Sequence, residues 1–301
     1  MRRLVANNLI GLTNIFANDC DLETLDLADL PKLDQLSVSG NKLTELTLKG
    51  FPELRYAELS NNSLCVVALS NLAELIWLNL SQNQIESISL SDLDRLQHLI
   101  ISKNPLLELQ LFNLPSLESI EARTIEATDL RLSDLPSLGH IDLEQGFLEF
   151  LELELLPVLY RLDLNDNKIT GLTLSDLPQL DSIHASRNGL EELILIGLPL
   201  LSQIYVTHNH LSSLIPFINH FTESAVDNIR LGIEYNRLDE SDCDDLLELK
   251  SLYDLVFGSI KYHRQGDDIE VPDYDDWPQE TILNFVYSLE NQEYWLDCGK
   301  N

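Results

Sequence analysis

Residues that could perform metal or nucleophilic chemistry are sparse in this 301-residue sequence. His208 and His210 alternate as two residues of one strand face would, but no third ligand stands near them in the pattern of a metal site. Six carboxylates among residues 267–276 could hold calcium, yet this run lacks the glycine and the spacing of a known calcium loop. The sequence has no phosphate-binding glycine loop and no Gly-x-Ser-x-Gly turn. We therefore expect a protein that is not an enzyme and that needs neither a metal nor a cofactor.

The charge of the chain restricts its partners. Nineteen Lys and Arg residues stand against fifty Asp and Glu residues, which gives a formal net charge of -31. A field of this sign repels nucleic acid and anionic membranes and attracts basic proteins. We expect a basic protein partner, no nucleic acid and no membrane, although the charge could also serve solubility alone.

Cysteine usage and the N-terminus bear on the compartment. The four cysteines are widely separated, without the density of a disulfide scaffold, so reduced thiols are expected; they are Cys20, Cys65, Cys243 and Cys298. The apolar run after Arg2 and Arg3 is cut by Asn7 and Asn8, and no stretch approaches the ~20 apolar residues of a membrane helix. The sequence predicts a cytoplasmic monomer, while export without a cleaved signal peptide stays open.

A repeat of 21 residues organises most of the chain. The apolar residue that opens each copy recurs ten times without insertion, at Leu9, Leu30, Phe51, Leu72, Leu93, Leu114, Leu135, Leu156, Leu177 and Leu198. With this residue as position 1, apolar residues recur at positions 4, 7, 9, 14, 17 and 19. Spacings of two indicate strands whose apolar side chains point inward and whose neighbours point outward.

Polar residues mark the bends of the repeat. Position 12 is usually Asn, as at Asn41, Asn62, Asn83, Asn104, Asn167, Asn188 and Asn209. Such amides can bond the backbone of adjacent turns and form a ladder. Ile125 and Gly146 interrupt the series, and a local bend or bulge is expected there because the turn hydrogen bonds are lost.

The pattern L-x-x-L-x-L-x-x-N-x-L resembles the leucine-rich repeat family, in the short form common in bacterial proteins, and covers residues 9–218 nearly continuously. The resemblance implies a mainly β solenoid whose L-x-L-x-x-N strands form a parallel concave sheet. Two strand segments and two turns use up 21 residues, so the convex side has no room for a helix of ~10 residues. We expect short strands or extended segments there.

The ends of the solenoid need caps. We assign residues 1–218 to a partial N-terminal half repeat and ten full repeats, and residues 219–262 to an irregular last repeat with a small cap that contains helix. We expect residues 263–301 to form an acidic linker and a C-terminal helix that begins near Pro278. Some bacterial effectors that this architecture resembles carry a ubiquitin ligase domain with a catalytic Cys-x-Asp motif; Cys243 to Asp245 match it only superficially, inside an expected cap helix.

Outward positions 6 and 8 of each copy form columns on the concave face, with neighbours about 4.8 Å apart. Tyr56, Trp77 and His98 place large rings in one column, where they have no core duty and could anchor a partner. In the other, Glu121, Asp142 and Asp163 stack like charges, which a basic partner would relieve, unless solvent alone suffices. The expected partner-binding residues are Tyr56, Glu58, Trp77, Asn79, His98, Glu121, His140, Asp142, Arg161, Asp163, His184 and Tyr205.

These observations favour a non-catalytic protein-binding module whose concave face docks a basic protein, as an inhibitor or immunity protein would. The alternative is a secreted effector or the recognition arm of a larger enzyme.

Overall fold

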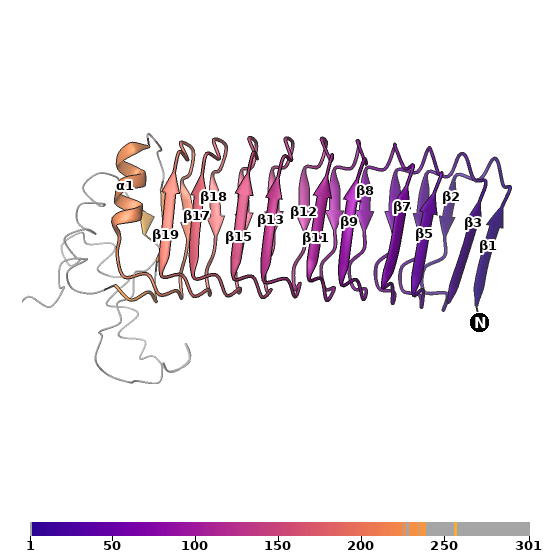
Figure 1. Cartoon of the computed structure of the whole chain (residues 1–301), viewed down its shortest axis with the longest axis horizontal. Coiled ribbons are helices and arrows are strands. Elements are labelled where there is room, and N and C mark those ends of the chain that lie inside the picture. The colour runs from indigo at the N-terminus through magenta and orange to yellow at the C-terminus, as the bar shows by residue number, and fades with distance from the viewer. Residues whose placement is uncertain (1, 225, 227–228, 234, 239–255, 258–301) are drawn as a thin grey trace, which may run out of the picture.

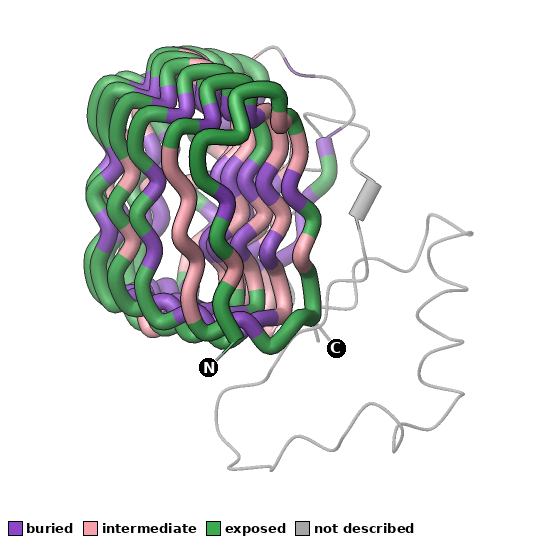
Figure 2. Tube along the Cα trace, turned by 90° about the vertical axis from the view of Figure 1, so that its right-hand side faces the viewer, coloured by how far each residue is buried: buried purple, intermediate pink, exposed green. Residues whose placement is uncertain are grey.

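The chain forms a stack of similar coils along one long axis (Figure 1). The computed structural model describes residues 2–224, 226, 229–233, 235–238 and 256–257. Figure 2, viewed along the stack, shows the coils lying almost over one another. The predicted mainly β solenoid with a 21-residue period is confirmed.

Within the described residues, one side of the stack is a parallel sheet of twelve short strands. The strands are β2 (Asn14–Phe16), β4 (Gln35–Ser37), β6 (Tyr56–Glu58), β8 (Trp77–Asn79), β10 (His98–Ile100), β12 (Ser119–Glu121), β14 (His140–Asp142), β16 (Arg161–Asp163), β18 (Ser182–His184), β20 (Gln203–Tyr205), β21 (Arg230–Gly232) and β22 (Val256–Phe257). From β2 to β20, each residue pairs with the residue 21 positions later, as Tyr56 does with Trp77. The repeat period therefore converts sequence columns into physical rows. We call this side the short-strand face.

The opposite side consists of five-residue strands. They are β1 (Arg3–Asn7), β3 (Thr24–Ala28), β5 (Glu45–Lys49), β7 (Val66–Ser70), β9 (Ser87–Ser91), β11 (Glu108–Phe112), β13 (Asp129–Ser133), β15 (Phe150–Glu154), β17 (Gly171–Ser175) and β19 (Glu192–Ile196). They form separate two-stranded parallel sheets, β1 with β3, β5 with β7, and so on to β19. The expectation that this side holds short strands in place of helices is confirmed.

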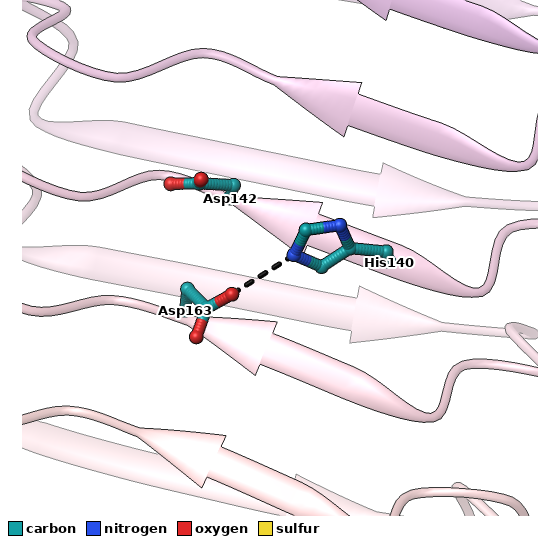
Figure 3. Close-up of side chains that lie close together, drawn as sticks. All are labelled: His140, Asp142 and Asp163. Atoms are coloured by element: carbon teal, nitrogen blue, oxygen red, sulfur yellow. Dashed lines mark hydrogen bonds and ion pairs between the residues drawn. The ribbon is translucent and has the colours of Figure 1, made fainter.

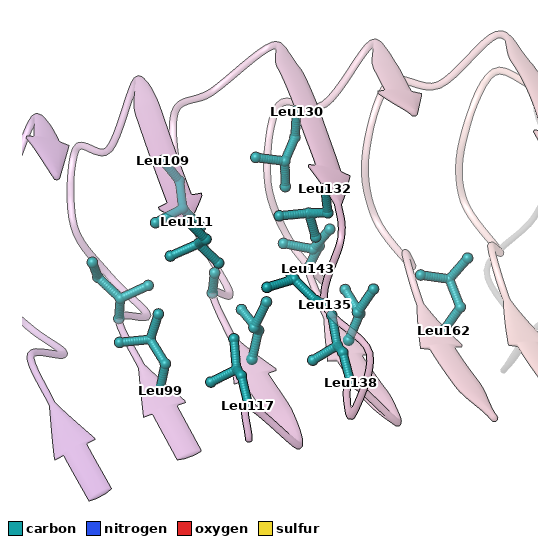
Figure 4. Close-up of a cluster of buried hydrophobic side chains, with 14 of the residues drawn as sticks. Leu99, Leu109, Leu111, Leu117, Leu130, Leu132, Leu135, Leu138, Leu143 and Leu162 are labelled. Carbon is teal, nitrogen blue, oxygen red and sulfur yellow. The ribbon is translucent and has the colours of Figure 1, made fainter. Parts of the chain in front are cut away.

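Leucine side chains from both sides fill the space between the two sets of strands (Figure 4). Leu99 comes from a short strand and Leu109 and Leu111 from a long one, and all three are buried. Alternation within each strand sends the remaining residues outward. Because an inward leucine is fully buried in nearly every copy, replacing one with alanine should cost about 2–5 kcal/mol. The core thus fixes the backbone and leaves the outward positions free for other roles.

The predicted asparagine ladder is present. Asn83 is buried, its Nδ2 donates to the carbonyl oxygens of Leu59 and Leu80 at 3.1 and 3.0 Å, and its Oδ1 accepts from the amide of Leu64 at 3.0 Å. Each amide therefore joins its own turn to the turn of the preceding copy.

The break in this ladder does not bend the strand pairing. β12, β14 and β16 pair in register across Ile125 and Gly146, so the expected bulge is wrong. The preceding residues, Thr124 and Gln145, have positive φ of 57° and 60°, as the matching residues of other copies do. Their amides donate to backbone carbonyls of the next copy at 2.9 and 2.8 Å. Backbone hydrogen bonds therefore hold these turns without the side-chain amide.

Helix α1 (Ile215–Glu223) packs against β19 at the C-terminal end of the regular coils. Its side chains Phe217 and Phe221 are fully buried, and they cover the apolar end of the last full copy. Beyond the helix, Asn236 continues the ladder by accepting from the amide of Leu211 at 3.0 Å. The domain boundary drawn at residue 218 falls inside this helix.

Some expectations concern segments outside the described residues. They are the cap helix with Cys243 to Asp245, the acidic run 267–276 and the helix from Pro278. Among the helices that the structure describes, none combines the length and the apolar character of a membrane span.

Candidate functional site

The twelve predicted site residues all lie on the short-strand face. Each short strand of the full copies has a buried middle residue, such as Ile141 in β14, and its first and third residues point outward. Every predicted residue occupies one of these outward positions in β6 to β20. The predicted column is also present, because Glu121 pairs with Asp142 and Asp142 with Asp163.

Asp163 lies at the centre of a hydrogen-bonded cluster. Figure 3 shows its hydrogen bond with His140, and Asp142 on the adjacent strand. Asp163 Oδ2 accepts from His140 Nε2 at 2.9 Å and from Arg161 Nε at 2.7 Å, and its Oδ1 accepts from Arg161 Nη2 at 3.0 Å. His184 Nδ1 lies 3.9 Å from Oδ1. These neighbours leave only 3% of Asp163 exposed.

Asp142, in the adjacent strand, is held by a second guanidinium. Arg123 Nε and Nη2 both lie 2.5 Å from its Oδ2, and the amide of Glu144 donates to its Oδ1 at 3.3 Å. Asp142 is only 1% exposed. Each of the two buried aspartates therefore has its own arginine. We call the group the Asp142–Asp163 cluster; its members are Arg123, His140, Asp142, Arg161, Asp163 and His184.

The electrostatics of the cluster favour ionised Asp163. Burial raises the pKa of its carboxyl, but hydrogen bonds from His140 and Arg161 and the nearby positive charge outweigh burial and lower the pKa from 3.8 to about 2. The hydrogen bond to Asp163 raises the pKa of Arg161. Burial lowers the pKa of His184, and the charge of Arg161 lowers it further, against the raising effect of Asp163.

These contacts correct one part of the sequence interpretation. The three stacked carboxylates were expected to repel one another unless solvent or a partner relieved them. Two of the three are instead buried and paired with arginines of the chain itself, and only Glu121 remains partly exposed. The two aspartates therefore have partners within the chain, and we expect the fold to depend on them.

The cluster also contains three side chains of the kinds that ligate metals. One ligand atom each from His140, Asp142 and Asp163 lies within 4.8 Å of the others. Both carboxylates already bind a guanidinium, so a divalent cation would have to displace Arg123 and Arg161 or place its charge beside theirs. The donor set can bind a metal, but its charge is already balanced by arginine.

Rings and small residues shape the rest of the face into two hollows. The first has a volume of about 450 Å³ and lies over β2 to β8, where Phe16, Tyr56, Glu58 and Trp77 surround Ser37. Asn79 borders this group and donates to Glu58 Oε2 at 3.0 Å.

The second hollow, of about 480 Å³, lies where β10, β12 and β14 begin and is lined largely by the bends that precede the short strands. His98, which shares a 2.8 Å hydrogen bond with Ser119, lines one side, and Tyr160 and His140 line the other. The Tyr160 ring covers Gly139, where a Cβ atom would come within 2.6 Å of the ring. Farther along the face, the rings of His184 and Tyr205 lie 4.8 Å apart.

Sequence reasoning missed three residues of this site. Arg123 lies at position 10, and extending the alternation of positions 6 and 8 by one step would have found it. Phe16 lies in the position 8 column, whereas Tyr56 and Trp77 lie in the position 6 column and far along the chain, so the sequence did not indicate that the three rings group together. Tyr160 lies at position 5, and Gly139 at the same position of the preceding copy could have indicated it, because a glycine leaves room for a neighbouring ring.

Comparisons with known proteins agree on the fold. No protein-family description and no curated protein sequence matches the chain. The functional domain of InlJ from Listeria monocytogenes, which includes a cysteine ladder, is 21% identical with a TM-score of 0.58 over 76% of this chain. The match spans only 52% of that InlJ structure, about half its length. The leucine-rich repeat domain of APL1B is 19% identical with a TM-score of 0.63, over 87% of this chain and 78% of that one. The chain thus folds as a leucine-rich repeat solenoid with a period of 21 residues.

Proposed function

We propose that this protein is a non-catalytic binding module that docks a basic protein on its short-strand face. The observation that carries the proposal is that large rings border two hollows, and that the outward rings of the short-strand face have no part in the core. Aromatic side chains in such positions are favoured anchors of protein interfaces. The leucine-rich repeat fold also suggests a protein-interaction module.

The charge of the chain supports a basic partner. A net charge of -31 attracts positively charged proteins over a long range and speeds their encounter. Close contact would fall to Glu58 and Glu121, which are partly exposed, because Asp142 and Asp163 are buried with their own arginines. An inhibitor or immunity protein against a basic protein would work in this way.

A capture experiment with matched variants tests the proposal. The wild-type protein, a face variant with Tyr56→Ala and Trp77→Ala, and a control with Phe112→Ala and Phe150→Ala would each be used to retain proteins from the native source. The control removes two exposed rings from the long-strand side. A basic protein retained by wild type and control but lost by the face variant would support the proposal.

Calorimetry with the purified partner then gives the size of the effect. The face variant should bind at least about tenfold more weakly, since anchor rings each contribute more than about 1 kcal/mol. Affinity should also fall as salt is added. Equal binding by the face variant, or loss of binding only in the control, would overturn docking on this face.

A further inference from the structure

The first hollow carries an inference about what the face recognises. In the position 8 column, the small side chain of Ser37 lies between Phe16 on β2 and Glu58 on β6, and all three residues line the hollow. Ser37 Oγ is satisfied within the chain, because it donates to Asn18 Oδ1 at 2.8 Å. Ser37 therefore adds no unpaired hydroxyl to the hollow. We call the hollow formed by Phe16, Ser37, Tyr56, Glu58 and Trp77 the ring pocket.

Three aromatic rings form the walls of the ring pocket. Phe16 is 66% exposed and Tyr56 is 40% exposed, whereas their strand neighbours Ile15 and Ala57 are buried and supply the core contacts. The face of an aromatic ring is negative and attracts cations, most strongly when the ring is Trp.

Glu58 supplies a negative charge at the edge of these rings. Its Oε1 accepts from the amide of Ser60 and its Oε2 accepts from Asn79, both at 3.0 Å, and both donors are neutral. The guanidinium carbon of Arg55 lies over the Tyr56 ring, 5.9 Å from the ring centroid. Two hydrogen bonds hold this guanidinium to Asp34 rather than to Glu58. Among the described residues, no lysine or arginine forms an ion pair with Glu58. The contrast with Asp142 and Asp163 is clear, since each of those carboxylates has its own guanidinium.

We infer that the ring pocket receives a lysine or arginine side chain of the docked protein. The cation would lie against the Tyr56 and Trp77 rings and pair with Glu58, while its aliphatic stem would contact Phe16. This inference rests on the proposed function, because the docked protein would supply the cation. Binding of a cation to the ring pocket can nevertheless be tested without that protein.

A titration with matched small molecules tests this inference. Nα-acetyl-arginine amide carries the cation, and Nα-acetyl-citrulline amide has nearly the same shape without the charge. The indole N–H signal of Trp77 reports binding in nuclear magnetic resonance spectra, and its absence from Trp77→Phe identifies it among the three tryptophans. The arginine derivative should shift this signal and bind about threefold or more tightly than the citrulline derivative.

Two charge variants sharpen the result. Glu58→Gln should remove most of the preference for the cation, whereas Glu45→Gln removes the same charge from an exposed position on the long-strand side and should leave that preference unchanged. Both variants should keep the wild-type circular dichroism spectrum. Equal binding of the two derivatives, or equal effects of the two variants, would overturn the inference.

The outcomes also separate this inference from the proposed function. If the citrulline derivative binds equally well but capture still depends on Tyr56 and Trp77, the face docks a protein and the ring pocket takes a neutral group. If the arginine derivative prefers the pocket but capture shows no dependence on the face, cation recognition stands and docking on this face is wrong.

Discussion

Replacing Asp163 with asparagine should destabilise the fold, although it removes one charge from a stack of like charges. The carboxyl has a pKa of about 2 in the folded chain against an ordinary value of 3.8, because His140 and Arg161 bind its ionised form despite its burial. At 1.36 kcal/mol for each tenfold difference, this gap corresponds to about 2 kcal/mol of stability at neutral pH. Asparagine cannot supply this contribution, because it carries no charge and turns an N–H group toward two donors.

The pH dependence follows from the direction of the shift. A carboxyl with a lowered pKa in the folded state stabilises that state fully above the unfolded value, here 3.8, and loses this effect as the pH falls through about 2. The difference in stability between wild type and Asp163→Asn should therefore shrink from about 2 kcal/mol at pH 7 to well under about 1 kcal/mol at pH 2. Effects of the many other carboxylates cancel, since both proteins share them.

Urea denaturation followed by circular dichroism measures this difference at each pH. Glu121→Gln is the matched control, because it removes a charge from the same column at a half-buried position where no ion pair is present among the described residues. The control should change stability by less than about 0.5 kcal/mol at any pH. A stability of Asp163→Asn equal to or above wild type, or a loss that stays constant down to pH 2, would refute this reasoning.

Two further substitutions test the turns. Asn83→Ala should lower the free energy of unfolding by about 1–3 kcal/mol, because it leaves the buried amide of Leu64 without a partner and removes one of the two side-chain donors at each of the Leu59 and Leu80 carbonyls. Urea denaturation would show unchanged stability if the ladder is dispensable. Leu155→Asn should raise the free energy of unfolding by about 0.5–1 kcal/mol, because Leu155 is 68% exposed and has a left-handed φ of 54° that Asn adopts more readily. Other copies place Asp, Asn or Gly at this position. A lower melting temperature would contradict this reasoning.

The architecture could be predicted because the same pattern of apolar and turn-forming residues recurs in ten copies. Inward leucines at spacings of two require strands on both sides of each coil, and 21 residues leave no room for a helix between them. Asn83 and its equivalents could likewise be assigned to turns, because a buried amide needs backbone partners. The helix at Ile215–Glu223 appears where the sequence departs from the repeat.

The pairing of the site charges could not be predicted in the same way. The columns place Asp142 and Asp163 side by side, but whether arginine reaches them depends on side-chain conformation rather than on the repeat. The guanidinium of Arg161 turns back to Asp163, two residues along its own strand. Arg123 reaches Asp142 from beyond the end of the preceding strand. Long side chains have several rotamers, so column position alone does not fix their partners.

The shape of the short-strand face nevertheless follows a rule that a sequence can express. Because the backbone repeats with little change, the relief of the face depends on differences in size between residues at the same position of neighbouring copies. Ser37 opens the ring pocket because Phe16 and Glu58 flank it in one column, and Gly139 accepts the Tyr160 ring because its own side chain is absent. A column that alternates large and small residues therefore marks a hollow, and a column of uniform residues marks a flat surface. Comparing neighbouring copies position by position thus singles out Phe16 and Tyr160 from the order of the residues alone.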